Sequence, residues 1–158
     1  MPHQDTPIYK AMFEAVSETF ENMAFVEVAE QSQEVGIEIP AEAVWVSILI
    51  HKPLQGELRL ALPPELLTTI TVDMFNLEPQ DVAESQRQDI IAEILNTLAG
   101  VFMTKLIPAD QTYQLGLPEH GEGPIPEDDE GAIVWNLQIE ETPILLVANG
   151  AGFITFNN

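Results

Sequence analysis

Four residues of the segment 78–106 have the types and spacing of a contact site: Asp89, Glu93, Asn96 and Gly100. At about 100° per residue, these positions fall on one face of a helix. We call them the polar stripe. Glu93 and Asn96, three residues apart, would point outward together as a carboxylate and an amide. Gly100 removes bulk from the same face at about 1 kcal/mol of helix propensity relative to Ala, so the stripe is typical of a surface that a partner approaches.

The opposite face of this helix is apolar and would hold it against a core. Five residues recur there at helical spacing: Ile91, Ile94, Leu95, Leu98 and Phe102. Any amphipathic helix needs a polar face, so the stripe also has an ordinary structural interpretation. Two details favour function. Asn96 is a poor helix former in mid-helix, and Gly100 is unfavourable unless close approach requires it.

Hydrophobic periodicity predicts the other elements that position this helix. The predicted helices cover residues 8–23, 64–75 and 78–106. Runs that are β-branched, aromatic or alternating predict strands at 25–30, 43–51, 57–63, 132–140, 144–148 and 152–156. The strands fall in pairs joined by turn residues, including an Asn-Gly hairpin signal at 149–150. We expect an α+β, two-layer fold with long helices on one face of a mainly antiparallel sheet.

Capping residues bound the central helix, and an acidic loop follows it. Two capping boxes compete for its start, Asp81 with Glu84 and Ser85 with Gln88. Residues 118–131, PEHGEGPIPEDDEG, are acidic and rich in Pro and Gly, so we predict an exposed loop there.

The composition indicates one acidic domain and excludes several classes of partner. With 158 residues, 46% of them hydrophobic, the chain can form a single domain over 1–158 with a buried core. It carries 26 acidic against 5 basic residues, a net charge of −21. Nucleic acids and anionic membranes attract clustered Lys and Arg, so we expect neither as a partner. The acidity predicts a solvated surface, with attraction to a basic partner as the alternative.

Cysteine usage and hydropathy bear on the compartment. The chain has no cysteine, which excludes disulfides and thiolate sites. No apolar run approaches 18 residues, and the first residues lack the features of a signal peptide. We therefore expect a cytoplasmic protein without a transmembrane helix.

No metal-ligand pattern is visible. His3, His51 and His120 have no ligand spacing to one another. The acidic loop 118–131 offers carboxylates beside His120, but it lacks the alternating acids and the fixed glycine of a calcium loop. An acidic cation-binding protein is therefore the weakest interpretation of the chain.

The polar stripe resembles a known signature. Asp89-x-x-x-Glu93-x-x-Asn96 is similar to the [Asp/Ser]-x-x-x-Glu-x-x-Asn pattern of the CheC/CheX/FliY phosphatases of bacterial chemotaxis, and DIIAEILNTLAG resembles the helix that carries it. CheC-like members carry two copies and CheX one. The first helix offers Ser17-x-x-x-Glu21, but Ala24 stands where Asn would be. The chain therefore resembles the CheX type, with a CheC-like fold.

The resemblance implies a function for each member of the stripe. The family dephosphorylates the phospho-aspartate of CheY, a response regulator of two-component signalling. Asn96 would orient the attacking water, and Glu93 would bind a lysine of the partner. Asp89 would lie at the edge of the contact. From its place on the face, we infer that Gly100 leaves room for the partner's loops.

Other expectations follow from the same resemblance. The chain would need no cofactor of its own, because the response regulator supplies the Mg²⁺, and it would form a homodimer. The alternative is a non-catalytic binding module for a response regulator or a flagellar switch component. Intact Glu93 and Asn96 favour the enzyme.

Overall fold

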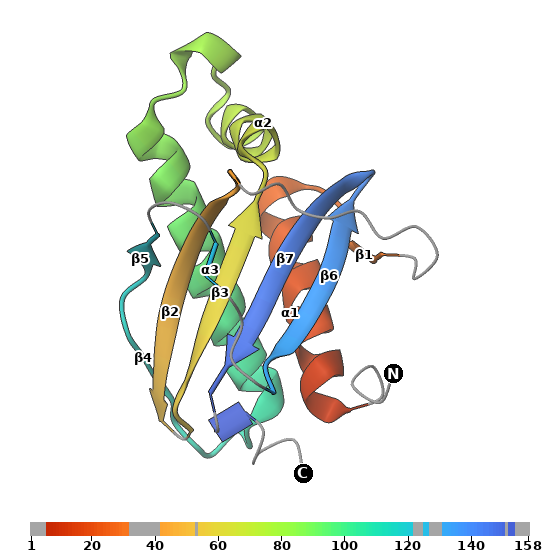
Figure 1. Ribbon diagram of the computed structural model, residues 1–158, viewed down its shortest axis with the longest axis vertical. Helices are drawn as coiled ribbons and strands as arrows, with labels where there is room; N and C mark the ends of the chain where they lie inside the picture. The colour runs from red at the N-terminus through yellow and green to blue at the C-terminus, as the bar shows by residue number, and fades with distance from the viewer. Residues whose placement is uncertain are drawn as a thin grey trace.

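The computed structural model describes residues 6–31, 42–52, 54–121, 125–126, 131–150 and 152–153. The helices are α1 (Pro7–Ala24), α2 (Pro64–Phe75) and α3 (Glu84–Leu106), with a short 3-10 helix η2 (Pro79–Asp81) before α3. The strands are β1 (Ala29–Glu30), β2 (Val44–Lys52), β3 (Gly56–Leu62), β4 (Gln114–Leu115), β5 (Glu119–His120), β6 (Ile133–Ile139) and β7 (Thr142–Asn149). Figure 1 shows their arrangement.

The strands form one antiparallel sheet in the order β1-β6-β7-β3-β2-β4, and β5 also pairs with β2. Two hairpins, β2–β3 and β6–β7, make up its centre. They join through β3 and β7, where Leu58 pairs with Ala148 and Leu60 with Leu146. The β2–β3 hairpin confirms the one predicted over 43–63.

Helices α1 and α3 pack on the same face of this sheet, as Figure 1 shows. Alternate residues of each strand point to that face because side chains alternate along a strand. The largest side chains buried between the layers include Trp135, Phe20 and Phe102, all fully buried. This confirms the predicted α+β fold with helices on a mainly antiparallel sheet.

Helix α1 has its capping chemistry within its own sequence. The hydroxyl of Thr6 accepts a hydrogen bond from the backbone N–H of Tyr9 at 3.3 Å, and Pro7 occupies the first helical position. The Trp135 indole N–H donates to the Tyr9 carbonyl at 3.1 Å, and the two rings stack with centroids 5.4 Å apart. These contacts tie the start of α1 to the sheet.

The strand predicted at 25–30 is wrong for most of its length. Phe25 ends α1 in the left-handed conformation (φ 59°), and its N–H donates to the carbonyl of Glu21 at 3.2 Å. Strand pairing begins only at Ala29, opposite Gln138. The alternating pattern of 25–30 predicts a strand, whereas its first residue, Phe25, is the C-cap of α1.

The strand predicted at 152–156 is wrong at Gly152 and Phe153, and its other residues lie outside the described part of the chain. Residues 152–153 are helical, and the N–H of Phe153 donates to the carbonyl of Gly150 at 3.2 Å. The Phe153 ring is fully buried and lies 6.2 Å from the ring of Phe102 in α3. A Cβ at Gly56 would overlap this ring, so the glycine makes its buried position possible.

Helix α3 begins between the two predicted capping boxes. Ala83 is its N-cap, and the side-chain oxygen of Gln86 accepts a hydrogen bond from the Ala83 N–H at 2.9 Å. This is half of a capping box, because alanine has no side-chain acceptor to return the bond. Further along, the Arg87 Nη1 donates to the Thr68 hydroxyl at 3.0 Å and ties α3 to α2.

The predicted loop at 118–131 is partly a strand. Glu119 and His120 form β5, paired with Ser47 and Val46 of β2, and the rest of the acidic cluster, 122–124 and 127–130, lies outside the described residues. The chain between α3 and this point therefore returns along the edge of β2.

Candidate functional site

Helix α3 carries the candidate site, and its buried face fixes its orientation. All five apolar residues predicted for that face have no exposed surface: Ile91, Ile94, Leu95, Leu98 and Phe102. They join the core with β2 and β3. Burying such side chains contributes roughly 1.5–3 kcal/mol each, so rotation of the helix about its axis would be strongly unfavourable.

The polar stripe lies on the opposite face of α3. Asp89, Glu93 and Asn96 are exposed, and Gly100 is partly exposed. The helix therefore presents a carboxylate, a second carboxylate and an amide in a row, separated by single turns. Their exposure agrees with the sequence prediction, while their roles stay predictions.

Glu93 has a neighbour that orients its carboxylate. The hydroxyl of Thr97, one turn later, donates to Glu93 Oε1 at 3.4 Å. The bond is long and exposed, so it biases the side-chain rotamer without fixing it. A carboxylate side chain that already favours one rotamer loses less conformational entropy when a cation binds to it.

Gly100 is partly exposed, and a side chain from another segment of the chain lies beside it. A Cβ built on Gly100 would lie 3.4 Å from the hydroxyl oxygen of Tyr113. Tyr113 belongs to the segment that returns along β2, and it is 39% exposed. The sequence does not predict this contact, because no local pattern shows that the chain turns back over α3 after Pro108.

A hollow of about 400 Å³ lies at this end of the polar stripe. Its lining residues come from α1, α3 and the returning segment: Glu18, Thr97, Gly100, Val101, Thr104, Lys105 and Tyr113. Thr97 and Gly100 belong to the hollow and also flank Asn96 on α3. The hollow is therefore continuous with the stripe.

Lys105 joins α3 to α1 beside the hollow. Its ammonium group lies 2.9 Å from Glu18 Oε1 and 3.5 Å from Glu14 Oε2. The hydrogen bond to Glu18, together with the charges of Glu18 and Glu14, raises the pKa of Lys105 above its ordinary value of 10.5. The lysine is therefore held as a cation between the two helices.

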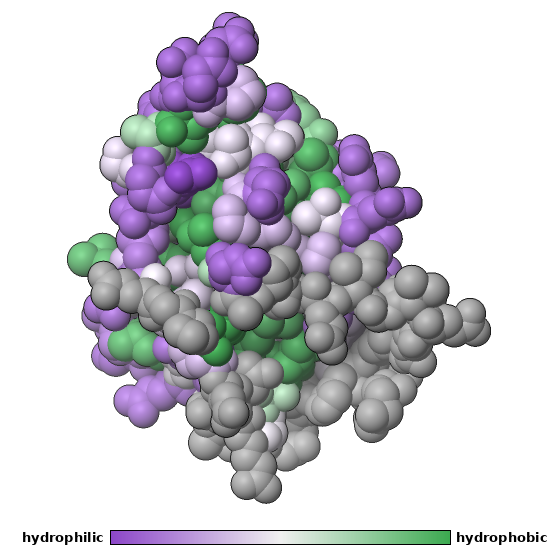
Figure 2. Space-filling model, turned by 45° about the horizontal axis from the view of Figure 1, so that its top comes forward, coloured by the Kyte–Doolittle hydropathy of each residue, from purple (hydrophilic) through white to green (hydrophobic). Residues whose placement is uncertain are grey.

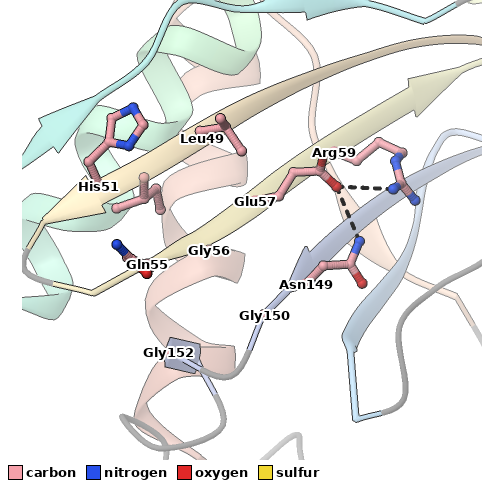
Figure 3. Close-up of a pocket in the computed structure, with 10 residues that line it drawn as sticks. Leu49, His51, Gln55, Gly56, Glu57, Arg59, Asn149, Gly150 and Gly152 are labelled. Atoms are coloured by element: carbon pink, nitrogen blue, oxygen red, sulfur yellow. Dashed lines mark hydrogen bonds and ion pairs between the residues drawn. The ribbon is translucent and has the colours of Figure 1, made fainter.

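A second hollow, of about 630 Å³, lies at the other face of the sheet, near the end of β2, the start of β3 and the end of β7. Figure 3 shows Glu57 accepting from both Arg59 and Asn149, at 3.0 Å and 3.3 Å. Arg59 is only 5% exposed, and its guanidinium lies 5.7 Å from the ring centre of Trp45. The sequence does not predict this cluster, because it joins residues 92 positions apart. The arginine is matched by Glu57, so the cluster reads as a structural ion pair.

The two described histidines, His51 and His120, belong to no group of metal ligands. His51 ends β2 and His120 lies in β5, and His3 is outside the described residues. In the ranges that the structure describes, no three His, Asp or Glu side chains form a group that could hold a metal ion. Among the described helices, none is long and apolar enough to cross a membrane.

The arrangement can bind a surface and orient water. The Asn96 amide can donate to and accept from the same water molecule, and it carries no charge. Glu93 provides a negative charge one turn away. A site of this kind has no nucleophile of its own, so its chemistry would act on a reactive group that a partner brings.

A family model and several solved structures match this chain. The model of the family "Chemotaxis phosphatase CheX" matches residues 44–124, just over half of the chain, including all of α3. No curated protein matches the sequence.

Solved structures share the fold at low sequence identity. The chemotaxis protein CheX from Vibrio vulnificus is 15% identical with a TM-score of 0.72, and the match covers 90% of this chain and 95% of that one. The CheX–CheY–BeF₃–Mg²⁺ complex from Borrelia burgdorferi contains a chain that is 17% identical, with a TM-score of 0.66 and coverage of 89% and 95%. FliY from Thermotoga maritima is 16% identical, with a TM-score of 0.62 and coverage of 98% and 90%.

Proposed function

We propose that this chain, which belongs to the CheX family of chemotaxis phosphatases, hydrolyses the phospho-aspartate of a CheY-like response regulator. One observation carries the proposal. Asp89, Glu93 and Asn96 stand exposed in a row on α3, in a member of a phosphatase family. The stripe is then the surface that meets the regulator.

The proposed chemistry needs little from the protein beyond position. Hydrolysis of an acyl phosphate requires a water molecule in line with the leaving oxygen and compensation of charge on the phosphoryl group. Asn96 orients the water, and as a neutral amide it does not repel the phosphoryl oxygens. Glu93 binds a lysine of the regulator and sets the register of docking, while Asp89 contacts its edge.

The regulator brings the metal in this proposal. A solved CheX–CheY complex contains Mg²⁺ together with BeF₃, and the described residues of this chain hold no group of metal ligands. The Mg²⁺ would compensate charge on the phosphoryl group from the regulator's side. The same proposal includes a cytoplasmic location and a homodimer. Light scattering of the purified chain would test the homodimer.

The deciding experiment follows decay of a phosphorylated CheY-like regulator with wild type, Asn96→Ala and Asn136→Ala. Asn136 is a matched control, an exposed asparagine on β6. We expect wild type and the control to accelerate decay, and Asn96→Ala to lose about 100-fold or more of the rate because the water is no longer oriented. Equal hydrolysis by wild type and Asn96→Ala would refute the mechanism.

A binding assay on the same proteins separates the alternative function. If the phosphorylated regulator binds wild type but decays at its intrinsic rate, the chain is a non-catalytic docking module. Under our proposal, Asn96→Ala still binds the regulator, since Glu93 and Asp89 remain in place.

A further inference from the structure

We infer that Tyr113 is a docking residue of the phosphatase site, and that the hollow beside it receives an uncharged side chain of the regulator. The inference rests on the proposed function and adds a specificity determinant outside the signature. Tyr113 lies 13 positions after Gly100 in the sequence, yet its hydroxyl oxygen is 3.4 Å from where a Gly100 Cβ would be.

The geometry places the hollow where a docked partner would reach it. Its lining includes Gly100, which adds no side chain, together with Glu18 of α1 and Tyr113 of the returning segment. Gly100 follows Asn96 by one helical turn, about 5–6 Å. A partner that brings a phosphoryl group to Asn96 therefore lies against the hollow as well.

Charge selects the kind of side chain that fits. The ammonium of Lys105 lies within 2.9 Å of Glu18 and 3.5 Å of Glu14. Because these charges already pair with one another, a charged group that entered would have to displace a member of an ion pair. The Tyr113 ring and Val101 offer apolar contact instead, so an uncharged, largely apolar side chain fits best.

Tyrosine suits this role physically. It presents a large rigid ring with few rotatable bonds, so it gains contact area at a small loss of entropy, and tyrosines are enriched among residues that dominate binding energy. At 39% exposure, the ring keeps surface that a partner can cover.

Steady-state kinetics on the phosphorylated regulator test the inference with four variants. We expect Tyr113→Ala to raise KM about tenfold, with kcat within about twofold of wild type. Tyr113→Phe should restore most of the loss, because the ring remains. Gly100→Ala should also raise KM, because the added methyl group would occupy part of the hollow. Leu49→Ala removes an exposed apolar side chain that lines the second hollow instead, and it should leave both constants unchanged.

The outcomes separate the two proposals. If wild type does not accelerate decay, the proposed function fails and the inference falls with it. If wild type is active but Tyr113→Ala and Gly100→Ala keep the wild-type KM, only the inference fails. A fall in kcat with KM unchanged would overturn it too. Circular dichroism confirms that each variant is folded, and Gly100→Ala gives an independent test if Tyr113→Ala is not.

Discussion

Glu93 and Asn96 are neighbours on α3, and the proposal gives them separable tasks. Under the proposal, the carboxylate would act before the chemistry, by binding the regulator, and the amide would act during it, by holding water. Their substitutions should therefore change different kinetic constants. A structural role for either exposed residue would change neither constant selectively.

Glu93→Gln tests the docking task without changing the size of the side chain. The glutamine removes the charge and keeps a hydrogen-bonding group, so we expect a loss of about 1.5 kcal/mol, or roughly tenfold in KM, with kcat nearly kept. The KM of wild type should rise with ionic strength, and that of the variant should rise less. A selective loss of kcat would contradict the assignment. Glu119→Gln, an exposed glutamate in β5, serves as the matched control.

The residues of the polar stripe could be predicted from the sequence, whereas their surroundings could not. Helical periodicity fixes which residues share a face, so the exposure of Asp89, Glu93 and Asn96 follows from spacing alone. Tyr113 approaches Gly100 because the chain reverses and pairs with β2, which is a non-local contact. The ion pair of Glu57 and Arg59 with Asn149 likewise depends on the pairing of β3 with β7.

Lys105 of α3 forms ion pairs with two glutamates of α1. The two helices also share the apolar core, but Lys105 is the described cation that reaches from α3 to the acids of α1. These ion pairs join α1 to α3 at the hollow beside Gly100, which Glu18 and Lys105 both line. The ion pairs of Lys105 with Glu18 and Glu14 therefore contribute to the shape of the candidate site as well as to stability.

The pH dependence of the free energy of unfolding tests whether the ion pairs of Lys105 stabilise the fold. The pKa of Lys105 is raised above 10.5 in the folded chain, so its contribution is fully present below pH 10.5 and is lost as pH rises through the folded value. We expect Lys105→Met to lower the free energy of unfolding at pH 8, with the difference from wild type shrinking above pH 10.5. Urea titrations of both proteins from pH 8 to 11.5 measure it. A difference that stays constant with pH would contradict the assignment of this stabilisation to the charge of Lys105.

At the scale of elements, periodicity predicted the helices and central strands well and the ends of the chain poorly. The two central hairpins and all three α-helices have strong local patterns that agree with their burial. FVEVAE alternates like a strand, but Phe25 is used as a left-handed helix cap. GFITF looks like a strand as well, yet Phe153 turns into the core because Gly56 leaves space for its ring. Both departures come from tertiary contacts that a local pattern does not contain.

At the scale of the molecule, the fold separates the core from a strongly acidic surface. Hydrophilic residues cover the top and flanks of the face in Figure 2, with apolar residues visible between them. With 26 acidic and 5 basic residues, most of the carboxylates have no basic side chain to match them. Their mutual repulsion opposes the compact state, whereas the buried core favours it.

Salt should therefore stabilise this protein. The screening length falls from about 30 Å at 0.01 M to about 3 Å at 1 M, so added salt weakens repulsion between distant surface carboxylates. Each 1 kcal/mol of repulsion relieved should raise Tm by about 2–4 °C for a chain of this size. Thermal unfolding in 0.01 to 1 M NaCl measures the effect, with choline chloride to separate screening from specific sodium binding. A Tm that does not change or falls with salt would mean that the carboxylates do not repel one another appreciably in the folded protein. Charge repulsion would then oppose folding much less than a net charge of −21 implies.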